Sequence, residues 1–325
     1  QRIQKLVMLS SNLILQVLHI IVLLIWKNYY VYVSATVVTT IINNLILNAI
    51  CNKIHPHLKE KTKPVSFEKE PIRNRIYSTF VYKIGGVAIN NTDNILISML
   101  VSTAAVGFYS NYYTLISAIQ GFIAIIFSMV LLFYHFVAAL GLVGFSLLFN
   151  DVITVWLGSK YLFDSKTVFI IAFNFYITNA ITPIWMYREA NGLFDQVKYL
   201  MLIRAAINIV LSVALGKICG TFGILLATAI SLIATNFWYE PNILFKEIFE
   251  APVLNYWTGQ IKYFSATVLG LIIAYYSVRN IPNGIIMLLI KAVIIAVSVS
   301  LPFFAVSYKS TEFKTATDFL KTRRK

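Results

Sequence analysis

Residues 104–149 read AAVGFYSNYYTLISAIQGFIAIIFSMVLLFYHFVAALGLVGFSLLF, which is 46 positions without one Asp, Glu, Lys or Arg. As a single α-helix this stretch would be about 69 Å long, more than twice the roughly 30 Å hydrocarbon core of a bilayer. The chain must therefore turn within it, and we place the turn near Ser128. The stretch predicts two consecutive membrane-crossing helices.

The composition agrees with a membrane protein. Of the 325 residues, 58% are hydrophobic and 12% are charged, and the mean hydropathy is +0.75. Apolar segments repeatedly reach the roughly 20 residues that a transmembrane helix needs, whereas the alternation over about ten residues that is typical of a membrane β-barrel is absent. We expect an all-α, polytopic transmembrane bundle.

Apolar windows and helix-breaking residues together predict about ten spans. These lie near residues 6–26, 30–51, 77–101, 104–127, 129–149, 166–186, 198–216, 220–239, 258–278 and 284–308.

The basic residues predict the orientation. If the spans alternate sides, 18 Lys and Arg residues fall on one side and five on the other. The positive-inside rule makes the richer side cytoplasmic, and both termini then lie there. The same rule accounts for the net charge of +14 without a nucleic-acid partner. Residues 52–75 form a basic cytoplasmic linker and 309–325 a basic tail.

The sequence lacks the signatures of catalytic and metal sites. It has no Walker A loop, no HExxH and no GxSxG, which argues against an ATP-driven pump or a membrane hydrolase. Its two cysteines, Cys51 and Cys219, are far apart and lack metal-ligand spacing. We therefore expect a protein that is not an enzyme and that needs neither a metal nor a cofactor.

One predicted span, 77–101, contains unusually polar side chains. At 100° per residue, Asn90 and Asn94 share the face of Lys83, and Asn91 and Asp93 lie about 80° to either side. Because a carboxylate in hydrocarbon costs about 2.5 to 3.5 kcal/mol, this face should meet protein or water. Two interpretations stay open: amide contacts between helices, or the wall of a hydrated cavity.

Further polar groups lie in neighbouring spans. Tyr109 and Asn111 on the next helix are suited to bind sugar hydroxyls, although tyrosines near a helix end are also typical of the membrane interface. Arg204 and Lys291 fall within predicted spans, where a cavity role and snorkelling to the interface both stay open, while we expect Lys262 to snorkel.

Six segments in order resemble the Wzx-type polysaccharide flippases of the multidrug/oligosaccharidyl-lipid/polysaccharide exporter superfamily, which are related to MATE transporters. The resemblance covers essentially the whole chain. Its segments are 83–86 (KIGG), 92–98 (TDNILIS), 106–112 (VGFYSNY), 156–158 (WLG), 174–176 (NFY) and 188–194 (REANGLF).

The resemblance implies two six-helix lobes around a central cavity, often followed by two more helices. On that map, 1–51 holds the last two helices of the N-terminal lobe, 76–239 is a MATE-like six-helix C-terminal lobe, and 240–308 is the additional pair. It also implies a lipid-linked substrate, an undecaprenyl-diphosphate oligosaccharide, flipped across the bacterial cytoplasmic membrane for capsule, lipopolysaccharide or other surface polysaccharide assembly.

Helix faces and charge assign hypothetical roles within that scheme. Lys83 and Arg204 would attract the diphosphate, and Arg188 would engage it at the cytoplasmic mouth. Asp93 would pair with Lys83 or couple transport to H⁺ or Na⁺. The sugars would be met by Asn90, Asn91, Asn94, Tyr109 and Asn111. A polysaccharide polymerase and glycosyltransferases are the expected protein partners, besides the lipid bilayer.

The chain departs from the pattern in two places. About four helices of the first lobe are missing, so we expect the sequence to begin partway into a longer protein. The cytoplasmic connector expected near residues 128–132 is also nearly absent. Two alternative functions therefore remain: a small-molecule or drug antiporter of the same superfamily, and a truncated membrane scaffold that does not transport.

Overall fold

The computed structural model describes residues 29–54, 69–126, 131–282 and 284–308, together with a few positions between 15 and 25. These residues are almost entirely helical and contain no β-strand. The chain divides into two units, Gln1–Glu68 and Lys69–Lys325. Each unit is described by itself.

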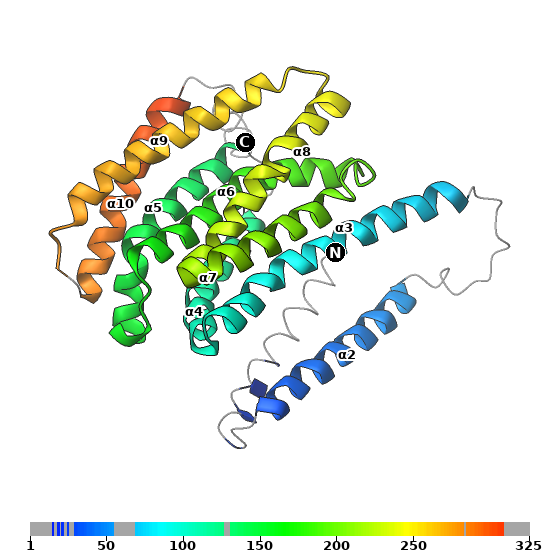
Figure 1. Ribbon diagram of the computed structural model, residues 1–325, viewed down its shortest axis with the longest axis horizontal. Coiled ribbons are helices and arrows are strands. Elements are labelled where there is room, and N and C mark those ends of the chain that lie inside the picture. Colours follow the sequence, from blue (N-terminus) through cyan, green and yellow to red (C-terminus); the bar gives the residue numbers. More distant parts are fainter. Residues whose placement is uncertain are drawn as a thin grey trace. The chain divides into compact units, whose positions relative to one another are not determined.

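The first unit contains α2 (Tyr29–Ile54), whose Thr36 hydroxyl lies 3.0 Å from Nε2 of His19. The second unit contains the remaining elements (Figure 1). Its helices are α3 (Lys69–Leu100), α4 (Thr103–Ile126), α5 (Leu131–Trp156), η2 (Ser159–Tyr161), α6 (Ser165–Ala190), α7 (Leu200–Ala234), α8 (Asn236–Leu244), the π-helical η3 (Phe245–Phe249), α9 (Leu254–Val278) and α10 (Ile285–Ser307).

Helices dominate because a backbone in lipid must satisfy its own hydrogen bonds. Hydroxyl side chains follow the same logic: Ser110 donates to the carbonyl of Val106 at 2.8 Å, four residues earlier. Within the described part of the chain, six helical segments are long and apolar enough to cross a membrane. They are Val33–Ile50, Phe133–Trp156, Ser165–Ala190, Leu200–Phe249, Leu254–Val278 and Ile285–Ser307. The protein is a polytopic helical membrane bundle.

α7 is a hairpin rather than one straight helix. Gly220 interrupts it with φ 59° and ψ −138°. In a straight helix Asn208 and Thr228 would be about 30 Å apart, yet Nδ2 of the first lies 3.1 Å from Oγ1 of the second. Near the turn the two arms touch, because a Cβ on Gly223 would lie 2.1 Å from the carbonyl oxygen of Leu215. The arms correspond to the separate spans predicted at 198–216 and 220–239.

The second unit has a large core and a smaller one. The large core joins residues of α3 to α7 and reaches α8 and α9. The smaller one lies where α9 and α10, side by side in Figure 1, pack on α5. At the same junction, Nζ of Lys291 in α10 lies 2.7 Å from Oδ2 of Asp151 in α5. The sequence left two interpretations of Lys291 open, snorkelling to the membrane interface and a role in a cavity. In the structure Lys291 pairs with a carboxylate.

The predicted bundle is confirmed, and several boundaries change. α3 begins at Lys69, inside the linker predicted at 52–75, and α8 with η3 was not predicted. α3 and α4 are not among the six apolar segments found in the described residues. Most of the span predicted at 6–26, the turn near Ser128 and the tail 309–325 lie outside the described residues. The assignment to lobes and an additional pair stays a prediction.

Candidate functional site: a polar cavity between α3, α4, α6 and α7

A cavity of about 300 Å³ lies inside the second unit, within the apolar bundle. Helices α3, α4, α6 and α7 supply all of its walls. It is lined by Tyr82, Ile89, Asp93, Tyr109, Tyr113, Ile116, Ile171, Asn174, Phe175, Thr178, Trp185, Met201, Arg204 and Thr228. Apolar rings and aliphatic chains with a few polar groups among them are typical of ligand pockets.

The cavity carboxylate, Asp93, is 9% exposed and is held by a relay of polar side chains. The Thr228 hydroxyl donates to Oδ1 and Oδ2 of Asp93 at 2.8 and 3.0 Å. The same hydroxyl accepts a hydrogen bond from Nδ2 of Asn208 at 3.1 Å. The α7 hairpin is what brings these two partners together, since they lie on its opposite arms. Asp93 is therefore fixed by both arms of α7.

The cavity cation is Arg204, which lies one helical turn before Asn208 on the first arm of α7. It is 6% exposed, and its Nε is buried without a hydrogen-bond partner. Its charge acts on the carboxylates of both Asp93 and Glu240. A second polar wall atom, Oδ1 of Asn174, is likewise buried and unpaired, while its Nδ2 donates to the Leu225 carbonyl at 2.9 Å. Buried polar atoms without partners are uncommon, and a bound ligand or water is one way to satisfy them.

A buried ion pair stands next to the cavity. Arg188, near the end of α6, is 1% exposed and donates from Nη1 to Oε2 of Glu240 in α8 at 2.8 Å. Its guanidinium also lies 4.3 Å from the ring centroid of Tyr82, a cavity wall residue. Asn236 donates a further hydrogen bond to the other carboxylate oxygen of Glu240. Arg188 is thus held inside the protein by α3 and α8.

The structure brings together three of the predicted site residues: Asp93, Tyr109 and Arg204 line the one cavity. Its wall on α3 runs through positions 82, 89 and 93, about 100° around the helix from Lys83. The partner of Asp93 is accordingly Thr228, and not the Lys83 that sequence reasoning offered as one alternative.

The other predicted site residues lie elsewhere. Lys83, Asn91 and Asn94 are exposed on another side of α3 of this unit, and Asn111 is half-buried on α4 outside the cavity lining. Arg188 is engaged by Glu240. The side chain of Asn90 lies outside the described residues. Their roles toward a substrate stay predictions.

Sequence reasoning gave no site role to Asn174, Asn208, Thr228 or Glu240, although Asn174 begins one of the segments that carry the family resemblance. A signal for the first three existed, since each is a polar residue within a predicted span. In those three spans only charged side chains were considered as site residues, so uncharged amides and hydroxyls were missed. Glu240 directly follows the span predicted at 220–239, and an acidic residue at a helix end is ordinarily explained by contact with water. In the described residues no group of three His, Cys, Asp or Glu is placed to hold a metal ion.

Residues 1–134 match the family model described as polysaccharide biosynthesis protein. This segment includes α2, α3 and α4 and therefore Asp93 and Tyr109 of the cavity. No curated protein and no solved structure matches the chain. The match covers less than half of the chain and relates that part to proteins of polysaccharide biosynthesis, while the six apolar helical segments make the chain a multi-pass membrane protein.

Proposed function

We propose that this protein is a secondary-type transporter that flips a lipid-linked oligosaccharide, carried on undecaprenyl diphosphate, across the bacterial cytoplasmic membrane. The observation that supports this most is the cavity around Arg204. It places a buried arginine with an unpaired Nε, and an amide oxygen without a partner, inside an otherwise apolar bundle. The family match over residues 1–134 supplies the link to polysaccharide assembly.

The volume of the cavity indicates what enters it. About 300 Å³ has room for roughly ten waters at about 30 Å³ each. That is enough for a diphosphate or one sugar ring, and not for a whole oligosaccharide. In this proposal the head group enters the cavity in part, while the polyprenyl tail stays in the bilayer.

In this proposal each polar side chain binds the part of the substrate that suits its chemistry. Arg204 attracts the phosphate oxygens, for which a guanidinium offers a fork of N–H donors. Tyr109 and Asn174 meet sugar hydroxyls, and Asp93 balances the charge of Arg204 or takes up H⁺ or Na⁺ for coupling. Lys83 on the exposed side of α3 would guide the head group, and Asn90, Asn91, Asn94 and Asn111 would add sugar contacts. Arg188, buried and engaged by Glu240, would support the neighbouring cavity wall at Tyr82 instead of meeting the head group.

The test is transport by the purified chain in proteoliposomes. The substrate is a dye-labelled sugar on undecaprenyl diphosphate, and a reagent outside the vesicles quenches whatever is flipped outward. Because a hydrogen bond to a charged group contributes about 1.5–3 kcal/mol, Arg204→Gln should lower the initial rate at least about tenfold. Arg204→Lys should retain an intermediate rate.

The matched control is Arg279→Gln. Arg279 is exposed, lies between α9 and α10 and stacks on Tyr276 outside the cavity. Its variant should transport at the normal rate. If folded Arg204→Gln protein flips the labelled lipid as fast as the unaltered protein, the assigned role of the cavity is wrong.

A drug antiporter is a second candidate, because a buried carboxylate such as Asp93 suits a cationic ligand. Efflux of a cationic dye that is lost in Asp93→Asn, without any flipping of the lipid-linked sugar, would select this function.

A further inference from the structure

The cavity around Arg204 carries two opposite charges that do not pair with each other. Asp93 on α3 is 9% exposed and Arg204 on α7 is 6% exposed, and both line the same space of about 300 Å³. Among the ion pairs of the described residues, none joins the two. The neighbouring Arg188 and Glu240, in contrast, meet at 2.8 Å. The protein therefore closes one buried set of opposite charges and holds the other apart on the walls of a cavity.

Three polar groups of the lining lack the partners that their burial requires. In the part of the chain that the structure describes, Nε of Arg204 and Oδ1 of Asn174 have no hydrogen-bond partner. The Asp93 carboxylate, which offers about four lone-pair positions, accepts hydrogen bonds from one described group, the Thr228 hydroxyl. Because most buried polar groups are paired, these three side chains indicate a ligand that binds in the cavity and touches all of them.

These groups specify the charge pattern of the ligand. The guanidinium of Arg204 donates to an anion such as a phosphate oxygen. Asp93 and the amide oxygen of Asn174 only accept, so the parts of the ligand that face them must be N–H or O–H donors. A phosphate without a cation would add negative charge near Asp93, where the apolar surroundings make the repulsion strong. An ammonium group next to the phosphate removes this repulsion, which a neutral hydroxyl does not.

The size and the walls of the cavity restrict the ligand further. Because about 300 Å³ has room for about one sugar ring, both charges must be carried by the same ring. The aromatic side chains of Tyr109 on α4 and of Phe175 and Trp185 on α6 line the walls. Such rings pack against the C–H face of a sugar. A phosphoethanolamine head group carries the same two charges, but it offers no ring to these walls.

We propose that the cavity selects a head group whose first sugar, the one joined to the diphosphate, carries a free amine. The phosphate binds at Arg204, the protonated amine binds at Asp93, and a sugar hydroxyl donates to Asn174. In this role Asp93 binds the cation of the substrate itself in place of H⁺ or Na⁺. The proposal rests on the proposed function for the lipid carrier, and it adds a substrate class, because it separates a free amino sugar from its N-acetylated form.

Binding of soluble head-group fragments tests this proposal without transport. The protein is placed in nanodiscs of phosphatidylglycerol, whose head group has no amine, and dissociation constants are measured by isothermal titration calorimetry at neutral pH. The probes are the methyl phosphodiesters of glucosamine 1-phosphate, N-acetylglucosamine 1-phosphate and glucose 1-phosphate, which share a singly charged phosphate. We expect the glucosamine probe to bind at least about tenfold more tightly than the other two, because it alone forms a charge-assisted hydrogen bond with Asp93.

Two variants separate recognition of the amine from recognition of the phosphate. The nearly isosteric Asp93→Asn should remove the preference for the glucosamine probe and retain binding of the glucose probe, which also shows that the variant is folded. Arg204→Gln should weaken all three probes by about tenfold or more, because each loses a hydrogen bond to a charged group.

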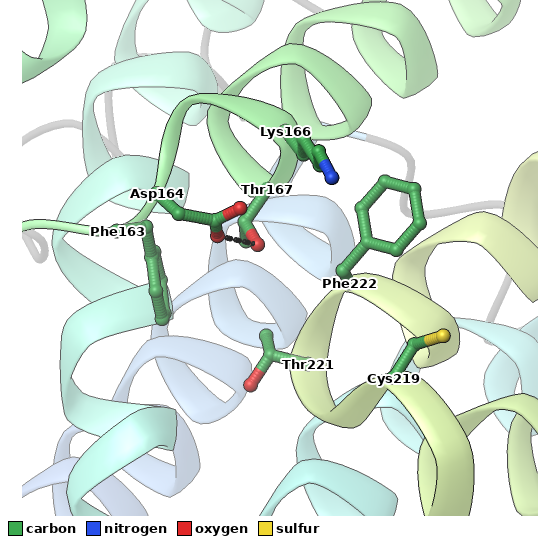
Figure 2. A pocket seen from close by; sticks show the side chains of 7 residues that line it. All are labelled: Phe163, Asp164, Lys166, Thr167, Cys219, Thr221 and Phe222. Atoms are coloured by element: carbon green, nitrogen blue, oxygen red, sulfur yellow. Dashed lines mark hydrogen bonds between the residues drawn. The ribbon is translucent and has the colours of Figure 1, made fainter.

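The matched control is Asp164→Asn, the same chemical change at an exposed position. Asp164 precedes α6, lines a separate pocket and accepts a hydrogen bond from the Thr167 hydroxyl (Figure 2). It is not part of the lining of the cavity around Arg204. The affinities of the three probes should therefore be unaltered in this variant.

Three outcomes would overturn the proposal. Equal affinities of the three probes for the unaltered protein, in sodium or in potassium buffer, show that the amine is not recognised. A preference that persists in Asp93→Asn places the amine elsewhere. Glycerophosphoethanolamine that binds as tightly as the glucosamine probe makes the cavity a site for a phospholipid head group instead.

The binding and transport assays separate this proposal from the proposed function. Selective binding of the glucosamine probe by a protein that does not flip the labelled lipid would support the site and refute the transport role. Flipping of the labelled lipid without any preference for the amine would refute the site and support the transport role.

Discussion

The buried ion pair between Arg188 and Glu240 permits a quantitative test of the fold around the cavity. In Glu240→Leu the guanidinium of Arg188 loses the carboxylate 2.8 Å away and stays 99% buried. Removing one partner of such a pair destabilises by about 3–5 kcal/mol, because the remaining charge is left unpaired. Glu189 also reaches Arg188, at 3.3 Å, so we expect the lower end of this range.

The same ion pair is tested further by the double variant Arg188→Met, Glu240→Leu. Replacing both members of a buried pair by apolar side chains is often close to neutral, so the double variant should regain most of the free energy of unfolding. A double-mutant cycle should then give a coupling energy of about 2 kcal/mol or more. The measurement is equilibrium unfolding in mixed micelles with rising dodecyl sulfate, followed by tryptophan fluorescence.

The control is Glu189→Ala, in which the lost contact belongs to a half-exposed carboxylate. It should change the free energy of unfolding by less than about 1 kcal/mol. If Glu240→Leu costs no more than this control, or if the two single changes simply add up in the double variant, the pair does not organise the junction of α6 and α8 as we infer.

Two other predictions concern helix contacts. Gly223→Ala places a Cβ 2.1 Å from a backbone oxygen of the facing arm of α7, so the folded fraction measured by fluorescence-detected size exclusion should fall sharply. In the control Gly144→Ala nothing lies within 4 Å of the new Cβ, so the folded fraction should not change. Equal folded fractions of the two variants would contradict the hairpin. Lys291→Met removes the cation that pairs with Asp151 and should weaken the packing of α10, which limited proteolysis would detect as faster cleavage between α9 and α10. The control Lys262→Met should leave the cleavage rate unchanged. An unchanged rate in Lys291→Met as well would show that the ion pair does not hold α10.

The helices were predictable because membrane spans obey a length rule that the sequence displays directly. The predicted spans at 198–216 and 220–239 correspond to the two arms of α7, and Gly220 at their boundary makes the turn with a positive φ. α8 and η3 were not predicted, since residues 236–249 mix aromatic, charged and proline side chains and show no apolar run of span length.

The cavity was harder to predict, and the reason is geometric. A helical wheel gives the angles between side chains, but it does not say on which side the rest of the bundle lies. On α3 the wheel grouped the asparagines with Lys83, whereas the packed face carries Gly85, whose Cβ position is filled by Met201 of α7. That close approach fixes the rotation of α3 and points Asp93 inward. Asn208 and Thr228, 20 positions apart, meet only because α7 reverses.

The contact between Lys291 and Asp151 also bears on how the membrane protein is made. A lysine at the centre of a span costs about 2.5–3.5 kcal/mol when a helix enters lipid alone, and Lys291, about two turns into α10, carries part of that cost. In α10 that cost falls on a helix synthesised 140 residues after its partner in α5. Insertion of the last span is therefore favoured when α5 is already in the bilayer and its carboxylate is available, so the ion pair couples the end of synthesis to a helix placed long before.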